Sequence, residues 1–345
     1  MQPSFSPLFP LSVESIWSLD PQSFVELLDS NVFMQKNRNV HFYTPNFTCT
    51  KNSSIDAPQE TFPSISITGT KCALKCKHCK GHLLNTMYPA TTPDDLFKLC
   101  CKLQQDHQAV GCLISGGCLP NGTVPLKPFI TTIAKIRHKL NFTVFIHTGL
   151  IDIETATLLK QTDAADAILI DIIGSQEIIN NIYQLNATVQ DYAKTLEILQ
   201  RTKLNFVPHI TVGLNNGVLD GEYNALQMIS KTKPSAIVII ALTPISKTDM
   251  EKTRPPQPYD IARVIATART IMPKTPIILG CMRPKNRQCT TTTATTDVLA
   301  LKAGVNAIAF PDRATINYAK THGWITTFSP YCCAKIGHVL SSCGE

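Results

Sequence analysis

The sequence predicts an α/β protein built as a (β/α)8 barrel of the TIM type, complete or partial, with a helical extension before it and a tail after it. From about residue 62, short β-rich runs alternate with amphipathic segments, and eight such pairs follow one another at about 30 residues per unit. Hydrophobic residues make up 43% of the chain and charged residues 17%, which suits a large buried core. A doubly wound open sheet gives a similar alternation, and periodicity does not separate the two folds.

The bulk properties are those of a cytosolic protein with one large domain or two ordinary ones. The chain has 345 residues, and its longest apolar runs, such as 236–242, are too short to cross a bilayer. The N-terminal stretch MQPSFSPLFP lacks the basic segment and the uninterrupted apolar run of a signal peptide. We therefore expect a cytoplasmic protein that has no membrane partner.

The first 61 residues differ from the rest and are expected to form a helical extension. Apolar residues between Val13 and Phe33 recur at helical spacing, and Asp20-Pro21 has the form of a helix N-cap followed by a first turn. Residues 46–61 are polar and rich in turn-forming residues. We expect the barrel over residues 62–312, and a C-terminal helix with a cysteine-containing tail over residues 313–345.

The elements of the barrel follow from hydrophobic periodicity. Strands are expected at residues 64–68, 111–115, 143–147, 167–171, 206–212, 236–242, 276–279 and 307–310. Helices are expected between most of them, at residues 92–105, 125–140, 153–162, 191–201, 222–230, 259–271, 296–303 and 314–321.

Sulfur, imidazole and carboxylate side chains recur where these strands end. In a parallel barrel the carboxyl ends of the strands meet at one rim, which is where active sites form. The residues expected at this rim are Cys72, Cys76, Cys79, Ser115, Gly116, Gly117, Cys118, His147, Asp171, His209, Cys281 and Arg283. The sequence therefore predicts a functional site at the carboxyl ends of the strands.

The stretch TGTKCALKCKHCKG (68–81) places three cysteines directly after the first predicted strand. The chain has 13 cysteines, and a reducing cytosol favours metal binding or catalysis over disulfides. A structural zinc site needs four ligands, which His78 or His82 would have to complete. A thioredoxin-like pair would leave Cys72 idle, whereas an iron–sulfur cluster held by three thiolates leaves one iron free. The spacing favours the cluster.

This CxxxCxxC loop, in this position of a βα barrel, resembles the radical S-adenosylmethionine (SAM) enzymes, over roughly residues 62–312. The resemblance implies that Cys72, Cys76 and Cys79 are the catalytic ligands of a [4Fe–4S] cluster whose free iron binds the amine and carboxylate of SAM. It also implies a 5′-deoxyadenosyl radical that abstracts hydrogen from an unactivated carbon, chemistry that the cofactor carries and the protein orients.

The same resemblance assigns residues to SAM. His78 matches a ring-bearing position near the adenine, and the turn Ser115-Gly116-Gly117 matches the one that meets the methionine amine. Asp171 is a candidate for the ribose hydroxyls, and His209 lies in VPHITVGLNNGVLDGE (207–222), which resembles the segment lining the adenine. Cys118 departs from the family, because an acidic residue is common there. The plainer interpretations are a strand-end cap for Asp171 and an ordinary turn for Gly116-Gly117.

Several segments resemble the biotin synthase and lipoyl synthase branch: TPISKTDM (243–250), RPPQP (254–258), ARTIMP (268–273) and ILGCMRP (278–284). The overall resemblance is to the biotin-synthase-like component of archaeal-type, two-protein lipoyl synthases. It implies sulfur insertion into an octanoyl chain on a lipoyl carrier protein, with a second, auxiliary [4Fe–4S] cluster as sulfur source. The candidate ligands of that cluster are Cys118, Cys281, Cys332 and Cys333, with the last two folded over the barrel mouth. His147 and Arg283 are the candidate substrate contacts.

The net charge and its distribution along the chain narrow the classes of partner that we expect. The net charge of +7 is spread along the chain, which argues against a nucleic-acid groove and suits an acidic carrier domain. A second lipoyl synthase component and a reductant such as ferredoxin or flavodoxin are the other expected partners.

Two alternatives remain open from the sequence. One is a biotin-synthase-like or other radical SAM enzyme without sulfur donation, and the other is a zinc-stabilised binding module. Cys100, Cys101 and Cys112 are expected to be packing residues, and Cys49, Cys289 and Cys343 have no assigned role.

Overall fold

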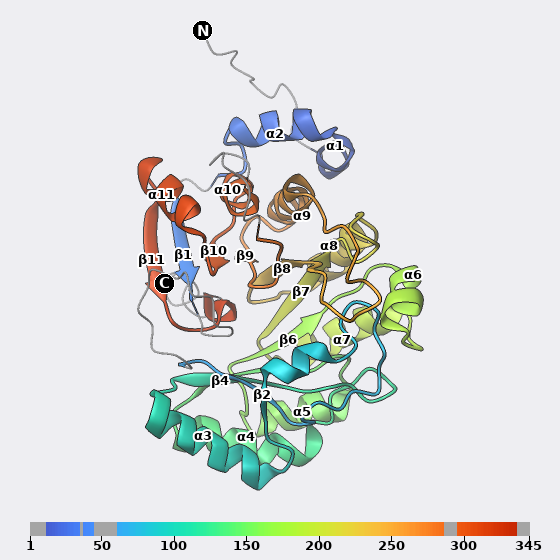
Figure 1. The fold of residues 1–345 in the computed structure, drawn as a ribbon, viewed down its shortest axis with the longest axis vertical. Coiled ribbons are helices and arrows are strands. Elements are labelled where there is room, and N and C mark those ends of the chain that lie inside the picture. The colour runs from blue at the N-terminus through green and yellow to red at the C-terminus, as the bar shows by residue number, and fades with distance from the viewer. Residues whose placement is uncertain (1–11, 35–36, 45–60, 286–294, 337–345) are drawn as a thin grey trace.

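The computed structural model describes residues 12–34, 37–44, 61–285 and 295–336, which form an eleven-stranded parallel sheet surrounded by helices (Figure 1). The strands are β1 (Asn39–Tyr43), β2 (Ser64–Ser66), β3 (Tyr88–Pro89), β4 (Gly111–Ser115), β5 (Thr143–His147), β6 (Ala167–Asp171), β7 (Phe206–Val212), β8 (Ile237–Ala241), β9 (Ile277–Leu279), β10 (Ala307–Ala309) and β11 (Ile325–Ser329). Their order in the sheet is β11-β1-β10-β9-β8-β7-β6-β5-β4-β2-β3.

The helices alternate with these strands. They are α1 (Val13–Ser18), α2 (Pro21–Asp29), α3 (Pro93–His107), α4 (Ile130–Lys139), α5 (Ile153–Gln161), α6 (Gln176–Ile178), α7 (Val189–Arg201), α8 (Glu222–Ser230), α9 (Pro258–Ile271), α10 (Thr296–Lys302) and α11 (Arg313–Thr321). Short helical turns are η1 (His82–Thr86), η2 (Lys127–Phe129), the π-turn η3 (Ile179–Tyr183) and η4 (Cys333–Lys335).

The eight predicted strands are all present, and β4, β5, β6 and β7 have the predicted bounds. From β4 to β10 each strand pairs with the next one along the chain, while β2 pairs with β4. In the described part of the chain, β3 and β11 pair on one side only, so the sheet curls without closing. The expected partial barrel is therefore confirmed.

The N-terminal and C-terminal segments meet at one edge of the sheet. Strand β1 lies between β10 and β11, and the three strands run parallel. His41 of β1 is hydrogen-bonded through Nδ1 to the Thr327 hydroxyl of β11 at 2.6 Å. Neither β1 nor β11 was predicted, because a strand of five residues depends on its tertiary partners and carries little periodicity of its own.

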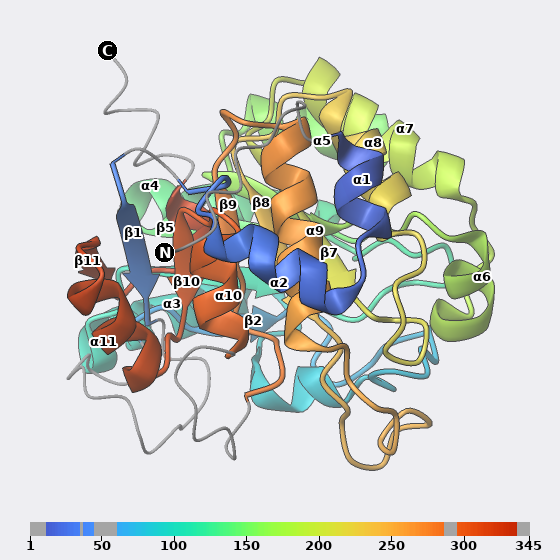
Figure 2. The same ribbon diagram turned by 90° about the horizontal axis from the view of Figure 1, so that it is seen from above.

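The segment predicted as a helical extension contains two helices, α1 and α2, with a break at Leu19, and it also supplies β1 to the sheet. Asp20 caps α2, because its carboxylate accepts hydrogen bonds from the backbone N–H groups of Gln22 and Ser23. The two helices lie across α9 and α10 (Figure 2), and Arg263 of α9 donates to the carbonyl of Ile16 at the end of α1. Most of the turn-rich stretch predicted at 46–61 lies outside the described residues.

Two apolar clusters occupy the two faces of the sheet. Alternate residues such as Ile168 and Ile237 pack outward against the helices. The residues between them, such as Leu169 and Val238, pack on the concave face, together with Cys332 and other residues of η4. The strands therefore read as continuous apolar runs because both of their faces are buried. Within the described ranges, no helix has the length and apolar character needed to cross a membrane.

A buried ion pair joins the ends of β9 and β10 to α10. The Nε and Nη2 atoms of Arg283 donate to the two carboxylate oxygens of Asp297, each at 2.7 Å. Nη1 donates to the carbonyls of Gly280 and Ala309 at 2.6 and 2.8 Å. Burial opposes ionisation of Asp297, but the charge of Arg283 outweighs it and lowers the pKa of the carboxyl. The pair is fully withdrawn from solvent.

Removing one partner of this pair should be costly. Arg283→Met would leave the Asp297 carboxylate buried, with only Lys285 3.6 Å away as a cation. We expect a loss of about 3 kcal/mol in the free energy of unfolding, measured by urea denaturation. Glu154→Gln is the control, because it breaks an exposed pair with Lys127 and should cost less than about 1 kcal/mol. Equal losses in the two variants would contradict the assigned role.

Candidate active site

The concave face of the sheet changes from apolar to polar along the strands. Phe145, Leu169 and Val207 belong to its apolar cluster. Two residues further along the same strands stand His147, Asp171 and His209. Because strand side chains alternate with a period of two, these three share the concave face with the apolar residues below them. The carboxyl ends of the strands thus form a polar layer above an apolar floor.

The three polar side chains of this layer interact. His147 Nε2 lies 3.6 Å from an Asp171 carboxylate oxygen, and the rings of His147 and His209 meet edge to face, with centroids 5.7 Å apart. Burial lowers the pKa of His209 to about 4, assisted by the neighbouring His147. Burial would raise the pKa of Asp171, but His147 and His209 hold it below its ordinary value. At neutral pH the layer therefore presents a carboxylate and a neutral His209.

The three-cysteine loop follows β2 and is held by backbone hydrogen bonds. Ala73 N–H donates to the Cys118 carbonyl and Lys77 N–H to the Ile182 carbonyl, each at 2.8 Å. The Cys76 thiol donates to the Tyr183 carbonyl at 3.4 Å. The loop is thus tied to the turn after β4 and to η3, and its cysteines lie at the expected rim.

The thiols of this loop influence one another. A hydrogen bond between Cys76 and Cys79 raises the pKa of Cys76 and lowers that of Cys79, and burial raises the pKa of both. Burial also raises the pKa of Cys118 to about 12, assisted by the nearby sulfur of Cys72. Of this hydrogen-bonded pair, Cys79 is therefore the thiol that more readily becomes a thiolate, the form that binds metals.

The turn Ser115-Gly116-Gly117 touches the cysteine loop directly. A Cβ on Gly117 would lie 2.1 Å from the Lys71 carbonyl oxygen and 2.6 Å from the Cα of Cys72. Gly117 N–H donates to the Thr68 hydroxyl at 2.7 Å, and the Ser115 hydroxyl donates to the His147 carbonyl at 3.0 Å. The glycine is therefore required by the close approach of two backbone segments, and not only by a turn.

His78 stands in the loop with an unused polar atom. Its Nδ1 is buried and has no hydrogen-bond partner among the described residues. Its ring lies against Tyr183, with centroids 5.0 Å apart. A buried imidazole nitrogen without a partner is costly unless a ligand satisfies it.

The chemistry of the donors fits a cluster with three thiolates. Among the residues that the structure describes, no three His, Cys, Asp or Glu side chains are placed to hold a single metal ion. A multi-iron cluster offers a separate iron to each thiolate and does not require the sulfurs to meet at one point. Three thiols in one loop, with a buried imidazole and a glycine turn beside them, suit such a cluster.

The four cysteines predicted for an auxiliary cluster fall into two groups. Cys118 lies beside the three-cysteine loop, where its carbonyl is 3.9 Å from the Cys72 sulfur. Cys332 and Cys333 are buried in the apolar cluster of the concave face, close enough to Cys281 for its charge to affect the pKa of Cys333. They are packed against the strands rather than folded over the barrel mouth. Their role as cluster ligands stays a prediction.

The remaining cysteines divide in a simple way. Cys100 and Cys112 are buried in the core, as predicted for packing residues, and Cys101 is half-buried. Cys49, Cys289 and Cys343 lie outside the described residues.

The structure places Arg283 differently from the substrate contact that the sequence suggested. Its side chain has no exposed surface, and its donors are used by Asp297 and by backbone carbonyls. A substrate would have to break the ion pair to reach the guanidinium. The predicted substrate contact stays untested, and the geometry favours a structural role.

Several residues of the site gave no signal in the sequence. Tyr183 ends an unpredicted π-turn, and Thr68 looks like an ordinary strand residue. Glu222 begins α8, and its buried carboxylate closes the loop after β7 by accepting hydrogen bonds from Gly213 N–H at 2.8 Å and Asp220 N–H at 2.6 Å. Burial raises the pKa of Glu222 to about 6, against the effect of these hydrogen bonds. Only their spatial neighbours could have identified Tyr183, Thr68 and Glu222 as residues of the site.

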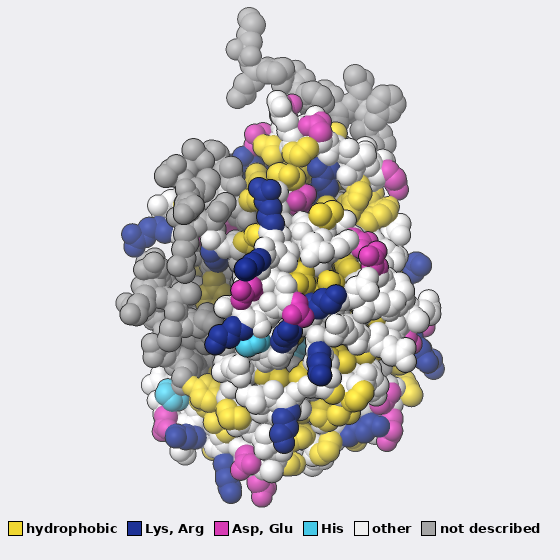
Figure 3. Space-filling view, turned by 45° about the vertical axis from the view of Figure 1, so that its right-hand side comes forward, with side chains coloured by type: hydrophobic (Ala, Val, Ile, Leu, Met, Phe, Trp, Pro, Cys, Tyr) yellow, Lys and Arg dark blue, Asp and Glu magenta, His cyan; other side chains and the backbone are white. Residues whose placement is uncertain are grey.

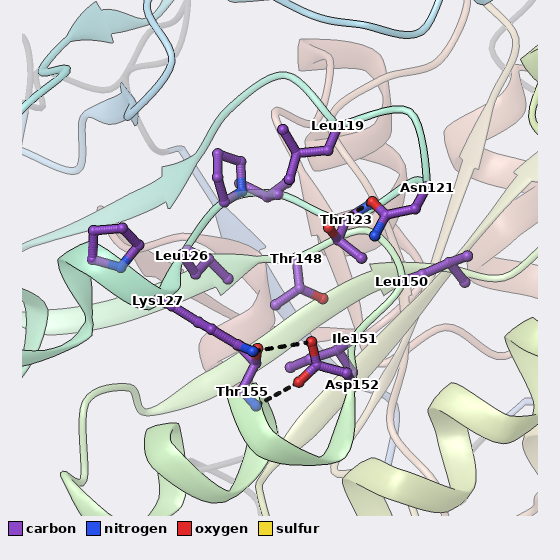
Figure 4. A pocket seen from close by; sticks show the side chains of 13 residues that line it. Leu119, Asn121, Thr123, Leu126, Lys127, Thr148, Leu150, Ile151, Asp152 and Thr155 are labelled. Atoms are coloured by element: carbon purple, nitrogen blue, oxygen red, sulfur yellow. Dashed lines mark hydrogen bonds and ion pairs between the residues drawn. The ribbon is translucent and has the colours of Figure 1, made fainter.

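A cavity of about 310 Å³ opens beside the site, between the loops that follow β4 and β5 (Figure 4). Most of its lining is apolar, including Leu119, Leu126 and Ile151. On one side Lys127 lies 3.6 Å from Asp152, which caps α5 by accepting a hydrogen bond from Thr155 N–H. Since Leu119 follows Cys118 in the chain, the cavity adjoins the strand ends of the site.

Known structures share this fold. The fold matches a crystal structure of methylornithine synthase (PylB) with a TM-score of 0.60 and 14% sequence identity, covering 92% of this chain and 95% of that one. It matches the FeFe-hydrogenase maturase HydG from Carboxydothermus hydrogenoformans with a TM-score of 0.60 and 11% identity, covering 92% of this chain and 76% of that one. At such identities the likeness shows the fold.

Sequence matches point to one branch. Residues 239–327 match the Biotin and Thiamin Synthesis associated domain. Over 167 residues the chain is 28% identical to the biotin synthase of Ruthia magnifica subsp. Calyptogena magnifica, covering 48% of this chain and 49% of that protein. It is 28% identical over 127 residues to the biotin synthase of Methylorubrum extorquens (strain PA1), covering 36% of each chain.

The chain is thus similar in sequence to biotin synthases over part of its length, and it shares its fold with methylornithine synthase and HydG. Its matches span about half or less of the length of these curated relatives. The match to the Biotin and Thiamin Synthesis associated domain runs from β8 into β11 and includes Arg283. The closer resemblance to a lipoyl synthase component stays a prediction.

Filling the space at Gly117 should loosen the cysteine loop. Gly117→Ala forces a methyl group into the Lys71 carbonyl, and overpacking of this kind costs about 1–3 kcal/mol. Hydrogen exchange measured by mass spectrometry should become faster over residues 68–81, because the bond from Ala73 N–H to Cys118 is strained. Gly323→Ala is the control: no atom lies within 4 Å of its Cβ position, so its cost is the strain of a left-handed backbone (φ 74°) and not overpacking, and exchange over residues 68–81 should stay unchanged. Unchanged exchange over 68–81 in Gly117→Ala would show that the contact does not hold the loop.

Glu222 should make stability depend on pH. Its pKa is raised from 4.5 to about 6 in the folded protein. Its contribution to the free energy of unfolding is therefore full when the pH is below 4.5 and is lost as the pH rises through about 6. The change corresponds to about 2 kcal/mol. The free energy of unfolding of Glu222→Gln, relative to the wild type, should therefore rise by that amount from about pH 4 to about pH 7. A difference that does not vary with pH would refute the raised pKa.

Proposed function

We propose that the protein is a radical SAM enzyme that inserts sulfur into an aliphatic chain. The observation that carries the proposal is the three-thiol loop, which packs backbone to backbone against the glycine turn of β4, above the polar ends of β5, β6 and β7. The similarity to biotin synthases and to the Biotin and Thiamin Synthesis associated domain supports it. The whole activity, its cofactors and its partners are part of the proposal.

Cys72, Cys76 and Cys79 would hold a [4Fe–4S] cluster, and the fourth iron would be left for SAM. When bound, these two cofactors supply a 5′-deoxyadenosyl radical able to abstract hydrogen from an unactivated carbon. The lowered pKa of Cys79 favours the thiolate form that an iron needs. The backbone hydrogen bonds of Ala73 and Lys77 tie the loop that carries the three thiols to the turn after β4 and to η3.

The residues around the loop would bind SAM. The unpartnered Nδ1 of His78 would hydrogen-bond to a cofactor atom, and the carboxylate of Asp171 suits a pair of ribose hydroxyls. Ser115, Gly116 and Gly117 would present backbone atoms to the methionine end. His209, kept neutral, would border the adenine without adding a second positive charge beside the sulfonium.

An octanoyl chain on a lysine of a lipoyl carrier protein is the proposed substrate. The apolar cavity beside Cys118 would bury part of such a chain, and His147 stands at the rim where the chain would enter. An auxiliary [4Fe–4S] cluster would donate the sulfur, with Cys118, Cys281, Cys332 and Cys333 as its candidate ligands. The acidic carrier, a second lipoyl synthase component and a reductant protein are the proposed partners.

A second candidate is a radical SAM enzyme of the same branch without sulfur donation. It is favoured by the separation of the four candidate ligands, since Cys118 adjoins the first cluster site while Cys332 and Cys333 lie in the apolar core. The relatives named biotin synthase and the likeness to methylornithine synthase keep other small substrates open.

Iron and sulfide analysis of anaerobically prepared protein tests the cluster assignment. We expect about eight irons per chain for two clusters, or about four for one. Cys76→Ala should lose about four irons, and Cys332→Ala should do so only if it is a ligand of the second cluster. A colourless protein that contains zinc would overturn the proposal in favour of the zinc-stabilised binding module.

The substrate is tested separately. The anaerobic protein is mixed with SAM, a reductant and an octanoyl-lysine peptide, and the mass of the peptide is followed. Sulfur insertion should increase the peptide mass while 5′-deoxyadenosine accumulates. An unaltered peptide with abundant 5′-deoxyadenosine would reject the octanoyl substrate and leave the radical chemistry in place.

A further inference from the structure

Every cysteine of the three-thiol loop has a lysine as its neighbour in the chain. Lys71 precedes Cys72, Lys75 and Lys77 flank Cys76, and Lys80 follows Cys79. Residues 61–93 contain no Asp or Glu at all. In a protein whose basic charge is otherwise spread out, this is a local concentration of positive charge, and the function proposed above does not use it.

The lysines are accessible. Lys71, Lys75 and Lys80 are exposed and Lys77 is half-buried, whereas the Cys76 thiol beneath them is buried. Lys80 pairs with Asp249 at 2.5 Å, while Lys71, Lys75 and Lys77 form no ion pair with any residue that the structure describes. Three cations are thus available to a partner, and Figure 3 shows Lys and Arg side chains gathered near the middle of one face.

The ion pair of Lys80 connects the cysteine loop to a second loop. Asp249 belongs to the segment between β8 and α9, which also carries exposed Lys247 and Lys252. Glu251 of the same segment is partly used internally, since its carboxylate accepts a hydrogen bond from Lys247 N–H at 2.5 Å. The two lysines and the two carboxylates of this segment balance in charge, so the unpaired positive charge beside the three cysteines is that of Lys71, Lys75 and Lys77.

We propose that Lys71, Lys75 and Lys77 form the docking surface for a small, acidic, one-electron carrier protein. The inference rests on the proposed function, which needs one electron per reaction cycle at the cysteine loop. In the docked complex the carrier loses one electron and the cluster of the loop gains it, and no covalent bond forms or breaks. Complementary charge would speed the encounter and orient the carrier.

The position of the lysines favours an electron carrier over an acidic carrier of the substrate. They are neighbours of the cysteines in the chain, so a protein bound to them would lie close to the three-thiol loop. Electron transfer slows steeply with distance and so benefits from this placement. A substrate must instead reach the concave layer of His147 and Asp171, which belongs to other strands.

The test compares a protein donor with a small one. Reduced plant-type ferredoxin serves as the acidic probe, and photoreduced 5-deazariboflavin serves as an uncharged donor that needs no docking surface. Stopped-flow absorbance follows cluster reduction, calorimetry measures ferredoxin binding, and 5′-deoxyadenosine is counted for both donors. The variant is Lys71→Glu/Lys75→Glu. Its control, Lys139→Glu/Lys160→Glu, makes the same charge change at exposed positions in the last turns of α4 and α5.

We expect the Lys71/Lys75 variant to be reduced by ferredoxin at least about tenfold more slowly at low salt, with weaker binding. The difference from wild type should shrink as salt is added. Reduction by deazariboflavin and the iron content should stay unchanged, and the control should behave as wild type. Lys71→Gln/Lys75→Gln should show a smaller loss of the same kind, and it replaces the Glu variant if the latter fails to fold.

Three outcomes would overturn the docking surface. The first is an unchanged rate of reduction by ferredoxin. The second is an equal fall in the rate of reduction with both donors, which would mean that the lysines act on the cluster itself. The third is weaker binding of an octanoylated carrier domain together with normal reduction by ferredoxin. Failure of the proposed function is distinct, because then the wild type itself would form no 5′-deoxyadenosine with deazariboflavin.

Discussion

The contact between Gly117 and the backbone of Lys71-Cys72 is the constraint on which the rest of the site depends. The Lys71 carbonyl oxygen stands 2.1 Å from where a side chain of Gly117 would begin. Two loops from adjacent strands, β2 and β4, can therefore approach until Ala73 bonds to the Cys118 carbonyl. Since a loop of this length has little core of its own, this contact converts a cysteine-rich segment into thiols of fixed position.

The sheet supplies the second half of the site through its period of two. The same strand face that buries Phe145, Leu169 and Val207 becomes, two residues later, the polar layer of His147, Asp171 and His209. A slip of one residue in register would move the whole layer to the helix side. The alternation of side chains along the strands thus sets both the apolar packing and the position of the polar layer. The apolar residues keep water away from one side of that layer.

The thiols and the lysines of the three-thiol loop lie at different depths. The thiols and His78 lie in or near the buried layer, where burial and the hydrogen bond between Cys76 and Cys79 alter the pKa values of these two thiols. The lysines between those thiols in the sequence reach outward, because a long aliphatic stem carries the ammonium group to solvent. One short loop therefore combines a buried thiol, that of Cys76, with lysines exposed to solvent. Arg283 is the opposite case, because this basic side chain is buried and its charge is paired with Asp297.

The sequence alone determined the eight central strands, the helices between them and the cysteine loop, because a period of two or 3.6 and a CxxxCxxC spacing are local properties. It also identified the polar rim, since parallel strands must end at one edge. The tertiary structure decided everything that depends on a distant neighbour. It paired β1 with β11, filled the concave face with Cys332 and Cys333, buried Arg283 against Asp297, and brought Tyr183 to His78. These contacts join segments far apart in the chain, and which of several possible partners a side chain meets is fixed only when the whole sheet has curled.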